Sequence, residues 1–221
     1  MKNIVFILDI DLHGEGRYSR TRRLPYKYSI KSWKKWCEKN DCELFVMNDL
    51  LLPHEKMAIC WQRYYLFDIL ESNNVNYDQI LSVDADTIVH PDCPNFFNET
   101  NGKYSAVRNN GSFEWVRRSM NGFSTLLFPG DIPFKVWDYI NCGFQIVNKD
   151  HKEYFEYVRN YYLENQLDIQ NAIVNVKAST DQTIINFLLR QQNIEINYLP
   201  ICYNLQDLAS KQLLYIHPSL W

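Results

Sequence analysis

Short apolar runs alternate with helix-period segments through residues 1–90, and this alternation restricts the fold more than any other feature of the sequence. Apolar runs occupy residues 3–8, 44–47 and 80–83, with the continuity typical of buried strands in a mostly parallel sheet. Strands that alternate with helices predict parallel pairing through right-handed crossovers. We therefore expect an α/β fold in which residues 1–90 form a nucleotide-binding half.

Two helices are predicted between these strands. Tyr26, Ile30, Trp33 and Cys37 recur at the spacing of one helical face, and residues 57–68 show the same period. The sequence contains no internal repeat, so a single domain over 1–221 is expected, with 91–221 as its second half.

The second half is less regular. Strands are predicted at 104–107, 144–147, 196–199 and 214–216. Capping-box spacings, Asp150 with Glu153 and Ser179 with Gln182, predict two helix starts. Residues 109–133 are rich in Gly, Asn, Ser and Pro and are predicted to form long loops, which we interpret as acceptor and lid elements.

Composition excludes several classes of protein. The formal net charge of −3 argues against general nucleic-acid binding. Six cysteines without a CxxC pair argue against a zinc ribbon and fit free buried thiols in a reducing compartment. No apolar run is long enough for a signal peptide or a membrane span. The chain is therefore expected to be soluble and cytoplasmic.

The strongest chemical signal is the run Ile80-Leu81-Ser82-Val83-Asp84-Ala85-Asp86-Thr87, in which an apolar strand leads into two acidic residues. Positions i and i+2 of a strand face the same side, so Asp84 and Asp86 are predicted to present their carboxylates together, with the small Ala85 between them. Two such charges repel each other unless a cation or proton lies between them. A hard divalent ion would relieve the repulsion and could bridge a diphosphate. The alternative interpretation is an Asp-rich turn that closes the strand.

Residues 77–89 resemble the DxD segment of GT-A fold glycosyltransferases, in particular the glycogenin and bacterial lipooligosaccharide galactosyltransferase type. Three further segments resemble that family in the same order along the chain. They are Asn141-Cys142-Gly143-Phe144-Gln145-Ile146-Val147-Asn148, Thr180-Asp181-Gln182-Thr183-Ile184-Ile185-Asn186 and Tyr215-Ile216-His217. The resemblance spans most of the chain and implies a Rossmann-like mixed sheet flanked by helices. It also implies transfer of a sugar from a nucleoside diphosphate donor to a carbohydrate or other hydroxyl acceptor, with residues 91–221 as the acceptor and metal half.

The resemblance implies a metal centre and a donor site. Asp84 would contact the donor ribose and the metal, Asp86 would bind the metal, and His217 would complete the protein ligands. Carboxylate and imidazole ligands favour Mn²⁺ without excluding Mg²⁺. A Lewis acid would stabilise the charge that grows on the departing diphosphate. By the same resemblance the base is uracil, so the donor is a UDP-sugar.

Five residues are predicted around the nucleoside and diphosphate. Asp9, Ile10 and Asp11 follow the first strand, where open α/β sheets bind ligands, although an acidic pair that opens a loop is as good an interpretation. Arg17 belongs to a basic run that is either a solvated loop or a contact for phosphate. Lys56 resembles a basic residue on the helix before the DxD strand, and a solvated helix face is the alternative.

Three residues are predicted beside the transferred sugar. Asn141 and Gly143 would lie against it, and the absent side chain of Gly143 would let the sugar approach the backbone. Asp181 would face the sugar or the acceptor hydroxyl, unless it only compensates charge at a helix N-terminus. Asp181 and Asn141 are the predicted catalytic residues. An inverting transfer would need only a general base such as Asp181, so the stereochemical course stays open.

The sequence departs from the family pattern after His217, because the glycine and lysine that would contact the diphosphate are missing. Either Arg17, Arg20 or Lys56 takes over that contact, or the chain is one domain of a longer protein, which we favour slightly.

Three rival functions stay open. A haloacid dehalogenase-type phosphatase also begins with an apolar strand and a DxD, here Asp9 to Asp11, but lacks the expected residue at position 13, which is His. A nucleotidyltransferase would need a glycine-rich basic loop, and residues 14–17 match it poorly. A module that binds sugar nucleotides without catalysis is the third.

Overall fold

A computed structural model of the chain describes residues 2–12, 26–130 and 132–206. Its single six-stranded sheet has the order β2-β1-β3-β5-β4-β6. The strands are β1 (Asn3–Leu8), β2 (Cys42–Met47), β3 (Gln79–Val83), β4 (Tyr104–Arg108), β5 (Ile140–Asn148) and β6 (Ile196–Leu199). β1 pairs in parallel with β2 and β3, whereas β5 runs antiparallel between β3 and β4. The mixed α/β sheet and the parallel first half are confirmed.

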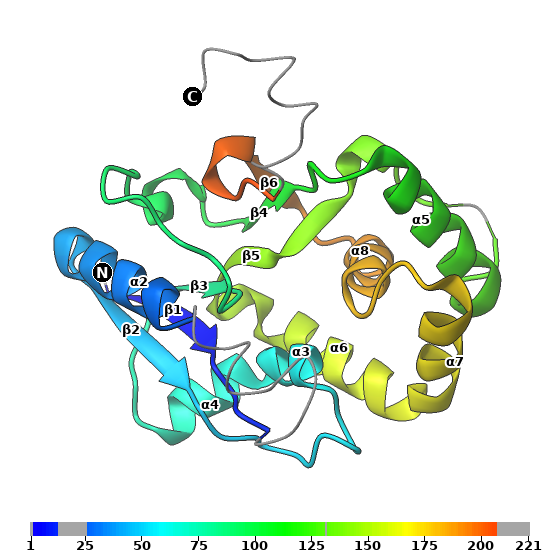
Figure 1. Cartoon of the computed structure of the whole chain (residues 1–221), viewed down its shortest axis with the longest axis horizontal. Helices are drawn as coiled ribbons and strands as arrows, with labels where there is room; N and C mark the ends of the chain where they lie inside the picture. The colour runs from blue at the N-terminus through cyan, green and yellow to red at the C-terminus, as the bar shows by residue number, and fades with distance from the viewer. Residues whose placement is uncertain (1, 13–25, 131, 207–221) are drawn as a thin grey trace.

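Helices cover both faces of this sheet (Figure 1). They are α2 (Tyr26–Asn40), α3 (Ile59–Gln62), α4 (Leu66–Ser72), α5 (Phe113–Leu127), α6 (Lys152–Glu164), α7 (Gln166–Val176) and α8 (Gln182–Gln191). Trp33 and Trp36 of α2 pack against Val5 and Ile7 on one face. The other helices share the core of the opposite face, where Ile4 and Phe6 point. Alternate residues of β1 thus enter separate cores, which explains why the strand is apolar throughout.

The prediction of long loops over 109–133 is wrong, because α5 occupies most of that segment. Ser112 caps the helix by accepting a hydrogen bond from the Trp115 N–H at 3.3 Å. A β-carbon on Gly122 would lie 2.6 Å from the side chain of Val176, so the glycine lets α5 lie close against α7. The polar and glycine content that resembled a loop therefore belongs to a closely packed helix. The lid interpretation of this segment loses its basis.

The predicted helix over 57–68 is divided in the structure. α3 is followed by a 3₁₀ turn at Arg63–Tyr65 and then by α4. Helix α7 was not predicted at all, because Leu167 and Val174 are exposed and blur its apolar face. The predicted strand at 214–216 lies outside the described residues. No helix in the described part of the chain is long and apolar enough to cross a membrane.

Both predicted capping boxes are wrong in detail. Before α6, the box is formed by Asn148 and His151 rather than by Asp150 and Glu153. Before α8, Ser179 accepts a hydrogen bond from the Thr183 N–H, but Gln182 turns toward β5 instead of closing the box. Longer-range hydrogen bonds to β5 therefore replace the local cap at Gln182.

Candidate active site

A cleft of about 510 Å³ opens at the C-terminal ends of β1 and β3. Leu8 and Ile10 line it from β1, and residues 82–86 line it from the end of β3. Its opposite wall comes from α3 and from residues 177–182, which lead into α8. The carboxyl ends of parallel strands are where open α/β sheets bind ligands, so the cleft is in the predicted place.

Asp84 and Asp86 both border this cleft, as predicted, but they lie in a turn rather than on a strand. β3 ends at Val83, and the backbone N–H and Oγ1 of Thr87 both donate to the Asp84 carbonyl, at 3.2 and 2.8 Å. Ala85 is buried and Asp86 is exposed. The turn interpretation is therefore correct for the backbone, yet the two acidic side chains still share one cavity.

The same turn borders a second cleft of about 600 Å³ on its other side. Asn141 and Gly143 line this second cleft, together with the segment 202–206. Asp84 and Asp86 line both cavities, so the turn is the wall between them. Two ligand-sized spaces meeting at a pair of carboxylates are suited to a two-substrate reaction.

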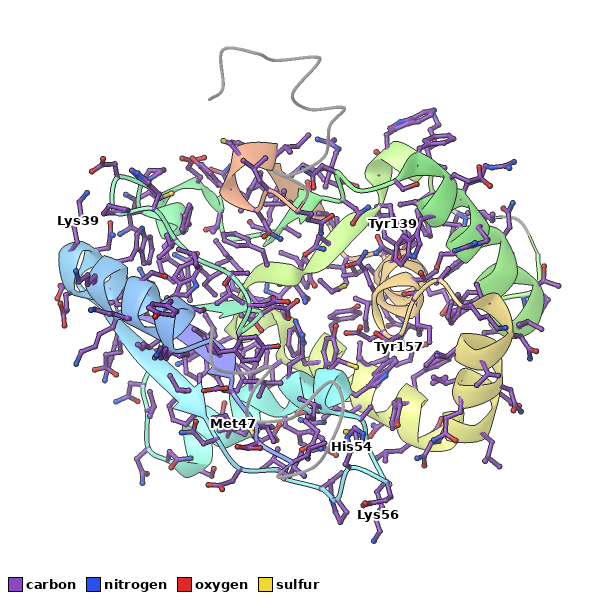
Figure 2. All side chains as sticks on the ribbon, viewed as in Figure 1. Lys39, Met47, His54, Lys56, Tyr139 and Tyr157 are labelled. Atoms are coloured by element: carbon purple, nitrogen blue, oxygen red, sulfur yellow. The ribbon has the colours of Figure 1, made fainter. Side chains whose placement is uncertain are left out.

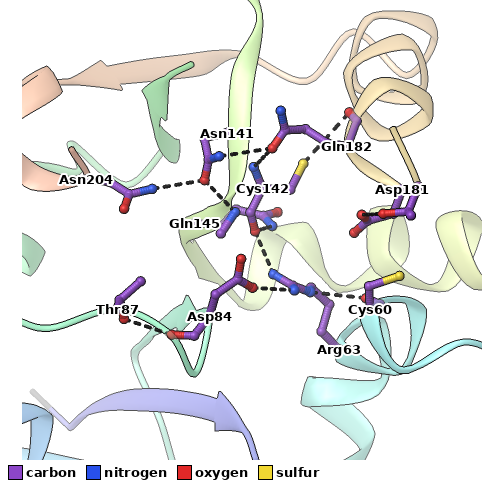
Figure 3. Close-up of polar contacts among 12 residues, drawn as sticks. Cys60, Arg63, Asp84, Thr87, Asn141, Cys142, Gln145, Asp181, Gln182 and Asn204 are labelled. Atoms are coloured by element: carbon purple, nitrogen blue, oxygen red, sulfur yellow. Dashed lines mark hydrogen bonds and ion pairs between the residues drawn. The ribbon is translucent and has the colours of Figure 1, made fainter. Parts of the chain in front are cut away.

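Arg63, which sequence reasoning missed, lies beside Asp84 and forms an ion pair with its carboxylate (Figure 3). Its Nη2 lies 2.5 Å from Asp84 Oδ1, its Nη1 donates to the Cys142 carbonyl at 2.7 Å, and its Nε donates to the Cys60 carbonyl at 3.1 Å. Burial opposes the charge, but the carboxylates of Asp84 and Asp181 outweigh it and hold the pKa of the Arg63 guanidinium above its ordinary value. Only an arginine can make these three directed contacts at once.

A signal for Arg63 was present in the sequence. It stands between Trp61 and Leu66 in an otherwise apolar stretch, where a charged residue has to find a partner. Lys56, the basic residue predicted on a helix near the donor, lies in the turn before α3. Figure 2 shows Lys56 at the lower edge of the molecule, and it does not line either cleft. Its predicted place on a helix is therefore wrong, whereas its approach to the donor stays a prediction.

The Asp84 carboxylate lies where a side chain of residue 143 would stand. A β-carbon on Gly143 would lie 2.5 Å from Asp84 Oδ2 and 2.9 Å from Asn141 Oδ1. The Gly143 carbonyl also accepts a hydrogen bond from the Asp84 N–H at 3.1 Å. The missing side chain of Gly143 therefore makes room for the Asp84 carboxylate, and the approach of a sugar to this backbone stays a prediction.

Asn141 is held by three hydrogen bonds within the protein. Its Oδ1 accepts from the Gly143 N–H at 2.7 Å and from Asn204 Nδ2 at 2.9 Å, and its Nδ2 donates to Gln182 Oε1 at 3.0 Å. Gln182 Oε1 also accepts from the Cys142 N–H at 3.1 Å. This amide network joins β5 to the start of α8. It places Asn141 as a positioning residue, and its predicted catalytic role stays a prediction.

Asp181 lies at the N-terminal end of α8 and borders the first cleft. It is only 6% exposed. Thr180 Oγ1 donates to its Oδ1 at 3.0 Å, whereas Oδ2 has no hydrogen-bond partner among the described residues. A buried carboxylate oxygen without a donor is unfavourable, and such exceptions call for an explanation.

Of the remaining predicted site residues, only one lines the first cleft in the part of the chain that the structure describes. Ile10 lines the first cleft, while its neighbours Asp9 and Asp11 are half-buried and do not line it. Arg17 and His217 lie outside the described residues. Their predicted roles are therefore not tested.

The acidic pair offers part of a metal site. Within 2–12, 26–130 and 132–206, no three His, Cys, Asp or Glu side chains are grouped closely enough to hold a metal ion. Asp84 Oδ1 is paired with Arg63, and the neighbouring Asp86 is exposed. Two carboxylates are suitable protein ligands for a hard divalent ion whose other ligands would be diphosphate oxygens and water.

The cysteines near the site are neutral thiols. None of the six forms a disulfide, as predicted. Cys60 and Cys142 lie close to Asp181 and Arg63, and burial raises the pKa of both thiols. Protonated thiols are poor nucleophiles, so the chemistry of this cleft rests on its carboxylates.

Comparisons with known proteins agree with this architecture. No protein-family model matches the sequence, and no curated protein sequence matches it significantly. Among solved structures, the apo glycosyltransferase GlyE of Streptococcus pneumoniae TIGR4 superposes with a TM-score of 0.52 at 16% identity, over 100% of this chain and 49% of GlyE. This chain therefore spans about half the length of GlyE.

Two further structures are similar at lower scores. A glycosyltransferase involved in glycosylation of the major capsid of PBCV-1 gives a TM-score of 0.48 at 15% identity, over 73% of this chain and 67% of that one. Mouse xyloside xylosyltransferase 1 gives 0.48 at 11% identity, over 90% and 85% of the two chains. With the mixed sheet described above, the superposition on GlyE shows that the chain has a fold of the GT-A type.

Proposed function

We propose that this protein transfers a glycosyl group from a nucleoside diphosphate sugar, with UDP as the expected nucleotide, to a hydroxyl of a carbohydrate or other acceptor. The observation that carries the proposal is the buried Oδ2 atom of Asp181, which has no hydrogen-bond partner among the described residues. Asp181 borders the same cleft as Asp84 and Asp86. A sugar supplies hydroxyl donors to such an atom. A phosphate ester alone would bring only acceptors to a cleft that already contains three carboxylates.

In this proposal Asp84 and Asp86 hold Mn²⁺ or Mg²⁺ together with the donor diphosphate. When bound, the ion would act as a Lewis acid that stabilises the charge of the leaving diphosphate. The role of Arg63 is to fix the Asp84 carboxylate, because its three hydrogen bonds leave the guanidinium one orientation. Preorganised charges of this kind need not rearrange during the reaction.

Asp181 accepts a hydroxyl hydrogen of the donor sugar and so orients the ring above the floor of the cleft. Arg63 lies near enough to Asp181 for the two charges to attract each other. Holding the sugar in one orientation lowers the entropic barrier to transfer.

The fold weighs against the phosphatase alternative, because Asp9 and Asp11 do not line the cleft that contains Asp84 and Arg63. A nucleotidyltransferase would also use a nucleotide, a metal ion and two carboxylates, so it remains the rival that the experiment has to separate.

The test is release of nucleoside diphosphate from a panel of UDP- and GDP-sugars, with Mn²⁺ or Mg²⁺ and a mixture of saccharide acceptors. We expect release of UDP from at least one UDP-sugar and a loss of about 100-fold in Asp181→Asn, which keeps the size of the side chain. Asp92→Asn, on the exposed loop after the turn, is the matched control. Formation of pyrophosphate from UTP and a sugar phosphate, without any release of UDP, would identify a nucleotidyltransferase instead.

A further inference from the structure

The first cleft continues beyond the residues assigned to the donor. From β1 and α2 it passes Asp84, Arg63 and Asp181 and ends between α5 and α7, which Figure 1 shows on the opposite side of the molecule from β1. We call the part lined by Trp115, Ile173 and Lys177 the far end of the cleft. None of these three residues belongs to the proposed donor site.

The nucleoside has a place at the other end. β1 lies between β2 and β3 in the sheet, so the chain changes direction across it, and ligands of open α/β sheets bind at such a switch point. Ile10 and Tyr26 line the cleft there. With the nucleoside at that end and the sugar near Asp181, two places remain for the second substrate, the far end of the first cleft and the second cleft. No Lys or Arg side chain of the described residues lines the second cleft, whereas Lys177 lines the far end of the first.

The far end has an aromatic wall that is held in place. Trp115 is half-buried in the first turn of α5, and its ring meets the ring of Tyr139 edge-on, with centroids 6.4 Å apart. The hydrogen bond from its N–H to Ser112 fixes the backbone of that turn. An indole fixed in this way offers a flat apolar surface with little loss of entropy on binding, and the apolar face of a sugar ring can stack on it.

The far end also carries an uncommitted positive charge. Two cationic side chains line the cleft within the described residues, Arg63 and Lys177. Arg63 is paired with Asp84, whereas no described carboxylate forms an ion pair with Lys177. Lys177 ends α7 with a left-handed backbone, φ 52°, where glycine or asparagine is the usual residue. The lysine side chain is therefore present at a position that does not favour it conformationally.

The two parts of the cleft differ in charge. Asp84, Asp86 and Asp181 make its middle part acidic, and an anionic group on the acceptor would be repelled there. Lys177 offers the opposite charge at the far end, and Arg118 lies one turn from Trp115 on α5. An acidic acceptor could enter in only one orientation, with its anionic group at Lys177 and its free hydroxyl toward Asp181.

We propose that the far end of the cleft binds the acceptor, and that this acceptor is a carbohydrate whose ring stacks on Trp115 and whose carboxylate or phosphate group pairs with Lys177. The inference rests on the proposed glycosyltransferase function, of which it names the acceptor class.

The experiment compares three probes of one shape by saturation-transfer NMR on the full chain, with and without UDP and Mg²⁺. They are methyl β-glucoside, methyl β-glucuronide and methyl β-glucoside 6-phosphate. We expect at least one of the two anionic probes to bind about tenfold more tightly than the neutral glucoside, since a charge-assisted hydrogen bond adds about that factor. Which anion binds better distinguishes a uronic acid from a sugar phosphate.

Variants at two positions locate the binding. Lys177→Asn should remove the preference for the anion while leaving glucoside binding unchanged, and asparagine tolerates the left-handed backbone at this position. Trp115→Ala should weaken all three probes, whereas Trp115→Tyr should retain binding through its ring. Lys135 and Trp137 are the matched control positions. The Lys135 Nζ lies 5.5 Å from the centroid of the exposed Trp137 ring, and neither residue lines a cleft.

Equal binding of the neutral and anionic probes to the unmodified protein would overturn the proposal, as would an anion preference that survives Lys177→Asn. Failure of all three probes to bind would overturn it too. Binding of UDP is measured in the same samples and should be unchanged in all three variants, Lys177→Asn, Trp115→Ala and Trp115→Tyr. Loss of UDP binding in the unmodified protein would instead contradict the glycosyltransferase function itself.

Discussion

Asp84 and Gly143 occupy a single space at the end of two neighbouring antiparallel strands. The Oδ2 atom of Asp84 lies 2.5 Å from the point where a β-carbon of residue 143 would stand, which is shorter than any normal contact. The position of the carboxylate between the two clefts therefore depends on the absence of a side chain on β5.

Gly143→Ala should displace the Asp84 carboxylate and weaken metal-dependent binding of UDP by at least tenfold, with little change of the melting temperature. The new methyl group meets the flexible ends of two side chains, Asp84 and Asn141, rather than backbone. Calorimetric titration measures the affinity. Gly111→Ala is the control, because its β-carbon would lie no closer than 3.3 Å to any atom. Unchanged affinity in Gly143→Ala would show that the Asp84 carboxylate can move without consequence.

Arg63→Lys should reduce turnover of the donor by about 100-fold although the charge is retained. A lysine cannot donate at once to Asp84, to the Cys60 carbonyl and to the Cys142 carbonyl, so Asp84 would lose its fixed orientation. The readout is kcat/KM for the UDP-sugar found in the donor screen. Arg159→Lys, which alters the ion pair with Asp68 away from both clefts, should leave turnover unchanged. Full activity of Arg63→Lys would contradict the claim that the three hydrogen bonds of Arg63 are needed to orient Asp84.

The sequence predicted the first half of the fold well, because strands that are buried on both faces, such as β1, leave an unmistakable apolar run. It failed where tertiary packing decides the structure. α5 is stabilised by the close approach of Gly122 to Val176. When only the sequence is known, a glycine at such a position indicates a loop. Arg63 was missed for a related reason, since its partner Asp84 is 21 residues away and the pairing exists only in the folded chain.

Gly122→Ala should destabilise the protein by about 1–3 kcal/mol through overpacking, since the added β-carbon would lie 2.6 and 2.8 Å from the two methyl groups of Val176. Urea unfolding measures the free energy. Val176→Ala removes both methyl groups, so the double variant should recover part of the loss relative to the sum of the single variants. Strict additivity would mean that these helices do not pack as described.

The protein should become less stable as the pH falls from about 7 to 5, in part through His151. Burial lowers the pKa of His151, although the nearby charge of Asp150 opposes this shift. The Nδ1 atom accepts a hydrogen bond from the Asn148 N–H at 3.1 Å, which only the neutral ring can do. The unfolded chain therefore binds a proton at a higher pH than the folded chain does. Stability is then complete above the unfolded pKa and declines as the pH falls through it.

Melting temperatures across this pH range test the contribution of His151. His151→Gln keeps an acceptor for the capping box but cannot titrate there, so its melting temperature should fall less steeply. His90→Gln is the control, because the His90 side chain is 71% exposed. Identical pH profiles for His151→Gln and the unmodified protein would contradict this assignment.

The central claim is that Asp84 and Asp86 form a metal-dependent site for a nucleoside diphosphate. Calorimetric titration of UDP and GDP, each with and without Mn²⁺, on the unmodified protein and Asp86→Ala tests it most directly. We predict binding of UDP that is at least tenfold tighter with Mn²⁺ than without it, weaker binding of GDP, and loss of the Mn²⁺ effect in Asp86→Ala. Absence of nucleotide binding under every condition would contradict the glycosyltransferase account.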